Sequence, residues 1–407
     1  MAICRYLDCL KPSPKLFGNS SLEQAKVEMY RRKVEFEGMQ SVGESFRNSS
    51  KAFKGRAIAG PSKIAQIPGL LKEQNYHVIG ITLQLYDYGK IGKTSGTCCA
   101  GKDIYDAKRV SEQLNIEHHV FNYESLFKEE VIEKFADSYL KGETPIPCVS
   151  CNQTVKFRDL FKSAKELGAD ALVTGHYVKR LGNLNQSKMY QPIDINRDQS
   201  YFLFSTTQEQ LDYLRFPLAD LPKQETRNLA KKMKLSIADK PDSQDICFVP
   251  NGNYKSVIEK LRPESYDPGN IVDLKGKVLG KHNGIINFTI GQRKGIKVGG
   301  QEEAIFVIKI NPETKEVIVG SRQDLNITKI EVKEINFLCD PKELEGDFFI
   351  KVRSTGRLLP CQVSDSATSV TLQSGESGVS PGQACVFYKK DDKGMRVYGG
   401  GWIVSTS

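Results

Sequence analysis

The 407-residue sequence has no apolar run near the roughly 20 residues that span a bilayer. Its start, "MAICRYLDCLKPSPK", has a short apolar core interrupted by Asp8 and no small-residue cleavage pattern, which argues against a secretory signal. It also has no internal repeat and no low-complexity tract. These absences argue against a membrane protein and a repeat protein. We expect a cytoplasmic protein, monomeric and without a membrane partner.

What is present is typical of a soluble globular chain. Hydrophobic residues make up 39% and charged residues 26% of the sequence. The length predicts two or three domains, each with its own core. The formal net charge of +9 fits either a mildly basic surface or a protein that neutralises phosphates. Charge alone therefore leaves nucleic acid open as a partner.

The ten cysteines are informative through their spacing. A disulfide framework belongs to small secreted domains, so a long cytoplasmic chain argues against one. Three places stand out: the vicinal Cys98 and Cys99, the C-x-x-C formed by Cys148 and Cys151, and Cys247 in "PDSQDICFVP".

From about residue 76 the pattern predicts strands and helices in alternation. "HVIGITLQLY", "EHHVFNY" and "DALVTG" are typical of strands, whereas "GKDIYDAKRVSEQLN", 124–140 and roughly 152–167 are typical of helices. Such alternation predicts an α/β fold with a parallel sheet covered by helices, and ligands at the carboxyl ends of its strands.

The remaining chain predicts two further domains. Residues 207–262 are more helical, with helices in "TTQEQLDYL" and "KQETRNLAKKMKL" and a loop at 240–253. Beyond 284, short alternating runs from "AIFVIKI" and "EVIVGS" to "RVYGGGWIV" predict a β-sandwich or barrel. We therefore expect an N-terminal extension (1–55), an α/β domain (56–206), a central domain (207–283) and a β-barrel (284–407).

The C-x-x-C in "TPIPCVSCNQTVKF" precedes a predicted helix, with Asn152 as its cap. Backbone amides and the helix dipole at that position favour a thiolate, which makes Cys151 a candidate nucleophile. Half of a zinc site would need a second ligand pair, and no other C-x-x-C occurs. A metal cluster on Cys148, Cys151 and Cys247, or inert thiols, remain open. Carboxylates around Cys247 would raise its pKa, so Cys247 taken alone favours an inert thiol.

Three other segments carry weaker signals. "VTGHY" ends a predicted strand, where Gly175 lets a ligand approach the backbone and His176 can point at it. "NRDQSYFLF" offers Arg197, Asp198 and Gln199 on a loop or a solvated turn. "HNGIINFTIGQRKG" has a composition suited to phosphate contacts.

The order of these motifs is more specific than any one of them. From about residue 69 onward, the succession "HVIGITLQLYD", "CCAGKDIYDAKRV", "TPIPCVSCNQTVKF", "LGADALVTGHY", "RDQSYFLF", "IADKPDSQDICFVP", "GKVLGKHNGIINFTIGQRKG" and "VSPGQACVFY" resembles the tRNA-specific 2-thiouridylases. The resemblance implies a Rossmann-like PP-loop domain of the adenine nucleotide α-hydrolase type, a small central domain and a C-terminal β-barrel. It implies the ATP-dependent 2-thiolation of the wobble uridine (U34) of tRNA, with Mg2+, by adenylylation of the C2 oxygen and sulfur transfer from a cysteine persulfide supplied by a sulfur-donor protein.

The resemblance also implies residue roles. Cys151 matches the nucleophile, and Cys247 the cysteine that carries the persulfide. Leu83 and Gly175 match nucleotide-contacting positions. The implied tRNA contacts are Ile146, Pro147, Cys148, His176, Arg197, Asp198, Gln199, Arg353, Ser354 and Gln383. Many members have Asn-Pro-Asp where this chain has Ile146, Pro147 and Cys148.

The family's Ser-Gly-Gly-Val-Asp-Ser loop, which cradles the ATP pyrophosphate, has no counterpart here. Residues 57–64 read "AIAGPSKI", and Pro61 removes a backbone donor. Pro68 is expected to interrupt the following helix, and the first strand is reduced to "RAIAG". We therefore expect weak ATP binding, as in a degraded copy of the family's start, with a diverged but working loop as the second explanation. The alternatives are a tRNA-binding or sulfur-accepting protein without adenylylation, and an iron-sulfur enzyme.

Overall fold

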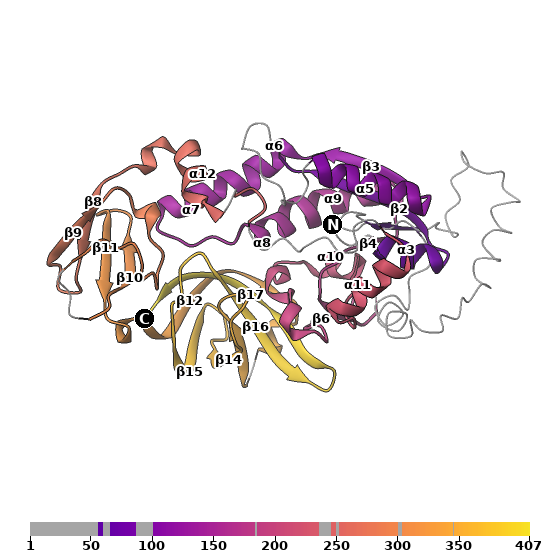
Figure 1. The fold of residues 1–407 in the computed structure, drawn as a ribbon. Coiled ribbons are helices and arrows are strands. Elements are labelled where there is room, and N and C mark those ends of the chain that lie inside the picture. Colours follow the sequence, from indigo (N-terminus) through magenta and orange to yellow (C-terminus); the bar gives the residue numbers. More distant parts are fainter. Residues whose placement is uncertain are drawn as a thin grey trace, which may run out of the picture. The chain divides into compact units, whose positions relative to one another are not determined.

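The computed structural model describes residues 56–59, 66–86, 101–183, 185–235, 246–249, 252–299, 303–344 and 346–407 (Figure 1). The chain forms two compact units. The first unit contains the described residues up to Phe127, Asn152–Ser200 and Thr206–Cys247. The second contains Lys128–Cys151, Tyr201–Ser205 and Phe248–Ser407. Each unit is thus assembled from segments that are distant in the sequence.

The first unit is built on a parallel sheet. Its strands are β1 (Arg56–Ala59), β2 (His77–Gln84), β3 (Glu117–Asn122), β4 (Ala171–Val173) and β7 (Leu214–Arg215), in the order β3-β2-β1-β4-β7. Each neighbouring pair runs parallel. β2 is buried along nearly its whole length, as expected for a parallel strand covered on both faces. The predicted α/β fold is confirmed.

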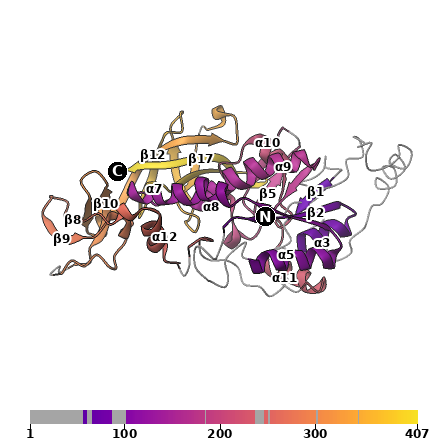
Figure 2. The ribbon, with the colours of Figure 1, turned by 90° about the horizontal axis from the view of Figure 1, so that it is seen from above.

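Helices cover both faces of this sheet. α3 (Gln66–Glu73), α5 (Gly101–Leu114) and α11 (Lys223–Lys232) lie along one side, and α9 (Leu160–Glu166) and α10 (Gln208–Tyr213) along the other (Figure 2). Leu70 and Leu71 of α3 pack with Val78 and Val173 of the sheet. Val110 of α5 packs against α11. A β-hairpin of β5 (Lys179–Leu181) and β6 (Lys188–Tyr190) follows β4.

The start of this unit corrects two expectations. β1 is a strand between β2 and β4, so the short "RAIAG" run still supplies the central strand. Pro68 does not break the next helix, because it is the third residue of α3 as described. Backbone N–H groups in a first turn have no partner within the helix, so proline is tolerated there. Residues 60–65, most of the predicted ATP loop, lie outside the described residues.

Two long helical stretches contain π-helical segments. The predicted helix over 124–140 consists of α6 (Glu124–Phe127), a π-helix (Lys128–Glu133) and α7 (Lys134–Leu140). The second stretch begins at α8 (Pro147–Cys151) and continues as a π-helix (Asn152–Asp159) into α9. It therefore starts five residues before the predicted position, because proline is well suited to the first helical residue.

The second unit contains two β-structures. β12 (Asn326–Phe337), β15 (Ser369–Ser377), β14 (Leu359–Val363), β13 (Phe348–Lys351), β16 (Ala384–Asp391) and β17 (Gly394–Thr406) follow one another in this order, and β12 also pairs with β17. That last pairing closes a barrel around Ile350, Val370 and Phe387. The predicted C-terminal barrel is confirmed.

The strand runs "AIFVIKI" and "EVIVGS" do not join that barrel. They form β10 (Phe306–Asn311) and β11 (Glu316–Gly320), which lie in a separate four-stranded sheet with β8 (Gly269–Val272) and β9 (Val278–His282). Alternation reveals that a strand is half-buried but not which strand it pairs with. α12 (Tyr254–Leu261) precedes this sheet.

Consecutive glycines make the barrel closure possible. A Cβ on Gly399 would lie 2.1 Å from the Asn336 carbonyl oxygen, and its φ is +135°. A Cβ on Gly400 would lie 2.6 Å from the Cys385 carbonyl oxygen, and one on Gly401 would lie 2.6 Å from that of Lys333. The "GGG" run thus lets β17 approach β12 and β16 closely.

Candidate active-site segments

The carboxyl edge of the parallel sheet collects several of the predicted residues. Leu83 is buried near the end of β2. Gly175 and His176 follow β4 directly, and both are partly buried. Their arrangement agrees with the expectation that ligands of a parallel sheet bind outside the carboxyl ends of its strands. Gly175 and Leu83 remain predicted nucleotide contacts.

His176 is fixed by two neighbours. Its Nδ1 lies 2.6 Å from the Oγ1 of Thr174, which is 1% exposed. Its ring lies edge-on to Phe157, with centroids 6.0 Å apart. Burial lowers the pKa of His176 well below its usual value, and the nearby Lys156 ammonium lowers it further. His176 is therefore neutral at physiological pH.

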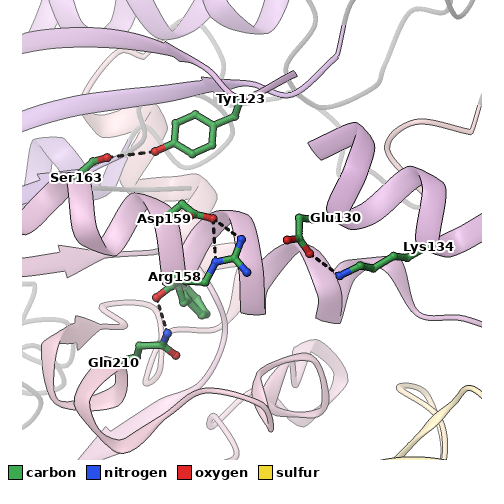
Figure 3. A network of polar contacts seen from close by, with 8 residues as sticks. Tyr123, Glu130, Lys134, Arg158, Asp159, Ser163 and Gln210 are labelled. Atoms are coloured by element: carbon green, nitrogen blue, oxygen red, sulfur yellow. Dashed lines mark hydrogen bonds and ion pairs between the residues drawn. The ribbon is translucent and has the colours of Figure 1, made fainter. Parts of the chain in front are cut away.

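Phe157 is in turn positioned from α10 (Figure 3). The Gln210 side chain donates to the Phe157 carbonyl oxygen at 2.6 Å and completes a capping box with Thr207. Figure 3 also shows Tyr123 bonded to Ser163, and Arg158 to its neighbour Asp159. In the second unit it shows a Glu130–Lys134 ion pair. The helix that carries Phe157 is thus tied to Tyr123 after β3 and to Gln210 of α10.

The segment 197–199 combines one exposed and two internal side chains. Arg197 is exposed at the end of a 3-10 turn. The buried carboxylate of Asp198 accepts from Gln191 at 2.7 Å and from the Ser200 amide at 3.0 Å. Gln199 exchanges two hydrogen bonds with the Tyr177 backbone, one through its side chain. Asp198 and Gln199 therefore shape the loop that presents Arg197 to solvent.

Cys247 is held through its backbone and is partly exposed. The Tyr86 hydroxyl, just beyond β2, donates to the Cys247 carbonyl oxygen at 2.6 Å, and the Tyr86 ring packs on Phe127. The next residue, Phe248, is 2% exposed and lies edge-on to Phe135 in the second unit. The first contact acts on the Cys247 carbonyl oxygen, and the second acts on the side chain of the following residue. Residues 236–245, which precede it, are outside the described residues.

The second unit anchors the chain after Cys247 more firmly. Tyr254 of α12 stacks on Tyr139 of α7, with ring centroids 4.7 Å apart. Arg262 bonds to Glu133 at 2.6 Å and to Asp137 at 2.8 Å. These two carboxylates raise the pKa of the Arg262 guanidinium. Phe248, Tyr254 and Arg262 are thus fixed to the π-helix and α7.

Cys148 and Cys151 lie within a helix, which corrects the sequence prediction. Cys151 was expected near the helix start with Asn152 as its cap. Instead it is the fifth residue of α8, and Asn152 is buried inside the continuing helix. Cys148 is exposed, whereas Cys151 is buried at 6% exposure. Pro147 and Ile146 are also buried. The position of Cys151 is therefore defined by packing rather than by the helix end.

The segment before Cys148 is bonded to a turn of the barrel. The Gln383 side chain donates to the Thr144 carbonyl oxygen at 2.7 Å, and the Thr144 amide donates to Pro381 at 2.8 Å. The Thr144 and Ser380 hydroxyls lie 2.9 Å apart. Gly382 has φ +83°, and a Cβ there would lie 2.8 Å from the Glu143 Cβ. The "SPGQ" turn, predicted to contact tRNA through Gln383, thus fixes the segment that leads into the C-x-x-C.

Arg353 lies on the barrel beside Ser354, which is partly exposed. The Arg353 guanidinium forms an ion pair with Glu376 and donates to the Ser377 carbonyl oxygen at 2.8 Å. Glu376 also pairs with Arg357 at 3.3 Å. One carboxylate therefore orients two arginines on this surface, and the pair keeps a net positive charge.

The motifs do not indicate the supporting residues Thr174, Tyr86, Thr144 and Ser380. Tyr86 could have been found from its place directly after a strand that ends at the ligand edge. Thr144 and Ser380 act through a hydrogen bond across 236 residues, which no local pattern reveals, whereas Thr174 lies only two residues before the histidine it bonds. Cys98 and Cys99 lie outside the described residues.

Within the described ranges, no group of three His, Cys, Asp or Glu side chains is arranged to hold a metal ion. The same residues contain no helix with the length and apolar character needed to span a membrane.

Comparison with known proteins first defines the class. Residues 62–251 match the tRNA methyl transferase HUP domain, 255–321 the tRNA methyl transferase PRC-barrel domain, and 327–403 the aminomethyltransferase β-barrel domain. Successive matches thus cover the parallel sheet except β1, the four-stranded sheet and most of the closed barrel. The chain has the three-domain architecture of a HUP-domain tRNA-modifying protein.

Curated relatives then define the family. The tRNA-specific 2-thiouridylase MnmA of Rhodospirillum centenum is 51% identical over 358 residues, covering 86% of this chain and 90% of that protein. MnmA of Bartonella bacilliformis is 53% identical over 355 residues, covering 85% and 90%. The chain belongs to the tRNA-specific 2-thiouridylase (MnmA) family. The solved U34-tRNA thiolase NcsA of Methanococcus maripaludis is 17% identical over 56% of this chain and 78% of its own, with a TM-score of 0.31, too low to support an inference.

Proposed function

We propose that this protein is a tRNA-uridine 2-sulfurtransferase that thiolates the wobble uridine, U34, of tRNA. The observation that carries the proposal is the identity of about half of all residues with 2-thiouridylases over most of both chains. The partners are tRNA and a sulfur-donor protein, and the location is the cytoplasm. A monomer is sufficient, because this one chain supplies both cysteines.

The chemistry assigns different tasks to the two cysteines. ATP, with Mg2+, supplies the adenylyl group that activates the C2 oxygen of the uridine. A persulfide on Cys247 attacks C2 through its terminal sulfur, and AMP leaves. The Cys151 thiolate then attacks the Cys247 sulfur, breaks the S–S bond and leaves sulfur on C2. A Cys151–Cys247 disulfide results, and a dithiol reductant restores both thiols.

The environments of the cysteines support this division. Cys151 is buried in a helix whose approach is bonded to the barrel, which suits a nucleophile that must act at one position. Cys247 is partly exposed, and the Tyr86 hydroxyl bonds to its carbonyl oxygen, which suits a thiol that a donor protein must load. Arg197 in the first unit and Arg353 in the second are basic groups suited to tRNA phosphates.

The test is thiolation of unmodified tRNA by the purified chain with ATP and a persulfide donor. Formation of 2-thiouridine together with AMP and pyrophosphate supports the proposal. A version with residues 57–64 rebuilt to contain Ser-Gly-Gly-Val-Asp-Ser serves as the matched control. If only the rebuilt protein turns over, the natural chain has lost adenylylation.

That outcome defines the second candidate function, a tRNA-binding or sulfur-accepting protein without adenylylation. The observation that favours it is the "AIAGPSKI" segment, which has one glycine, one serine and no aspartate. Tight tRNA binding and persulfide loading of Cys247, without pyrophosphate release, would establish it.

A third candidate is an iron-sulfur enzyme built on Cys148, Cys151 and Cys247. Cys148 adds an exposed thiol one helical turn before Cys151, but the three thiols are not arranged here to hold a metal ion, so this candidate requires them to come together on a cluster. Iron and sulfide content after anaerobic purification, compared with the Cys148→Ser protein, tests this candidate. Colourless, iron-free and active protein would exclude it.

A further inference from the structure

The hydrogen bond between Thr174 and His176 determines more than the position of the ring. Thr174 is 1% exposed, so its hydroxyl proton has no water to bond. Within the described ranges, its hydroxyl has one partner, the Nδ1 of His176 at 2.6 Å. A buried hydroxyl that left its proton unsatisfied would cost about 1–3 kcal/mol. The hydroxyl therefore donates, and Nδ1 accepts.

This direction fixes the tautomer of the imidazole. A neutral histidine has one protonated ring nitrogen, and an accepting Nδ1 places that proton on Nε2. The described residues supply no hydrogen-bond partner for Nε2. The Phe157 ring lies against the imidazole and, through Gln210, is itself held in place. Nε2–H therefore has a defined direction at the carboxyl edge of the sheet.

We infer that His176 serves as a neutral hydrogen-bond donor to an oxygen atom of the tRNA, and that Thr174 is the positioning residue that keeps its proton on Nε2. This inference rests on the proposed function, since it names the group that meets the RNA. It assigns His176 neither the role of a general base nor that of a cation pairing with phosphate. The oxygen is either a uracil carbonyl or a backbone oxygen beside the wobble uridine, because both are acceptors.

The first test does not depend on thiolation. Nitrogen-15 NMR of histidine-labelled protein reports the protonated nitrogen of each ring, and the His176→Gln variant identifies the signals. We expect the Nε2–H tautomer from pH 6 to pH 8 in the natural protein and in Thr174→Ser, and a tautomer mixture in Thr174→Val. An Nδ1–H tautomer, an imidazolium at pH 7, or an unchanged Thr174→Val spectrum would overturn the inference.

The second test measures binding of an anticodon stem-loop. Glutamine can place its amide near the position of Nε2, whereas asparagine reaches only Nδ1. His176→Gln should therefore keep affinity within about 2-fold, and His176→Asn should lose about 5- to 10-fold, as expected for one hydrogen bond. Equal affinity of the two variants would contradict a role of the donor in RNA binding, even where the tautomer is as expected.

A stem-loop lacking the base at position 34 distinguishes the two sources of the oxygen. If His176→Gln and His176→Asn bind that RNA with equal affinity, the acceptor lies on the base. Persistence of the difference assigns it to the backbone. Because these measurements need neither ATP nor sulfur, failure of thiolation by this chain would leave them interpretable.

Discussion

The two cysteine-bearing segments differ in how the protein holds them. The segment that leads to Cys151 is bonded to a barrel turn through Thr144, and Cys151 itself is buried. Cys247 is partly exposed, and the contacts at that position act on its carbonyl oxygen and on the next residue. The comparison teaches that one cysteine is buried behind a bonded segment while the other is partly exposed, as the proposed attack and the proposed loading respectively require.

The largest expected effect comes from removing the buried thiol. Cys151→Ser should lower thiolation by about 100-fold or more, because a serine hydroxyl cannot attack the Cys247 sulfur and form a disulfide with it. Cys148→Ser, one helical turn away, is the matched control and should keep most of the activity. Rates of 2-thiouridine formation, measured by mass spectrometry of digested tRNA, check both. Equal loss in the two variants would instead favour the cluster on three thiolates.

The second prediction weakens the contact between the segment before Cys148 and the barrel turn, and it leaves both thiols unchanged. Gly382→Ala forces a Cβ against Glu143 at a φ of +83°, and should destabilise the protein by about 2–4 kcal/mol and slow thiolation. Gly276→Ala has nearly the same φ, +82°, with nothing within 4 Å of the new Cβ. It should cost about 1–2 kcal/mol and leave thiolation unchanged. Urea unfolding and thiolation rates measure the difference, and equal costs would refute the close approach at Gly382.

The third prediction removes the hydrogen bond to the Cys247 backbone. Tyr86→Phe removes the hydrogen bond to its carbonyl oxygen and keeps the ring on Phe127, so thiolation should fall by about 2- to 10-fold. Tyr105→Phe, at an exposed position, serves as the control. Single turnover from persulfide-loaded protein separates this effect from loading. An unchanged rate would show that the Tyr86 contact does not position the carrier thiol.

The fourth prediction concerns the exposed arginine of the first unit. Arg197→Ala should weaken tRNA binding several-fold and reduce the slope of log K against log salt by about 1. Arg322→Ala, outside the proposed tRNA contacts, is the control. Filter binding at several salt concentrations measures the slope. An unaltered slope would remove Arg197 from the phosphate contacts.

The smallest effect is a difference in acid sensitivity between the units. Four of the five histidines lie in the first unit. Burial, together with the nearby His119 and Lys108, lowers the pKa of His118 to about 4. Because the unfolded chain takes up this proton near pH 6.5, the free energy of unfolding should fall as the pH drops from about 7 towards 4. His118→Gln should flatten that dependence.

The single tryptophan allows the units to be followed separately. Trp402 lies in β17 against Phe204, so its fluorescence reports the second unit, whereas circular dichroism reports both. When the pH is lowered, the unfolding midpoint measured by circular dichroism should fall more than the unfolding midpoint measured by tryptophan fluorescence. Identical shifts would mean that the two units unfold together.

Much of the fold could be predicted from local patterns. The strand His77–Gln84 and the helix Gly101–Leu114 follow from apolar runs and periodicity, and the closed barrel from its alternating strands. The helix before Cys151 was placed too late, since prolines in "TPIP" suggest a loop although Pro147 fits a first helical residue. β10 and β11 were placed in the wrong sheet, because strand pairing depends on distant residues.

The site was predictable only in part, for the same reason. Ordered motifs single out Cys151, Cys247 and His176. The hydrogen bonds that define their surroundings join residues far apart, such as Tyr86 with Cys247 and Thr144 with Gln383. Motif order therefore predicts which side chains react, and only the fold shows which side chains orient them.

The closure of the barrel by β17 sets a limit on when the protein can work during its synthesis. Residues 394–406 supply the strand that completes the barrel, and the "SPGQ" turn that holds Thr144 belongs to it. A nascent chain that has exposed Cys148 and Cys151 but not yet β17 lacks that support. On the ribosome, the thiol proposed to react is thus made more than two hundred residues before the strand that completes the barrel, and the segment before it lacks this support until residues 394–406 have emerged.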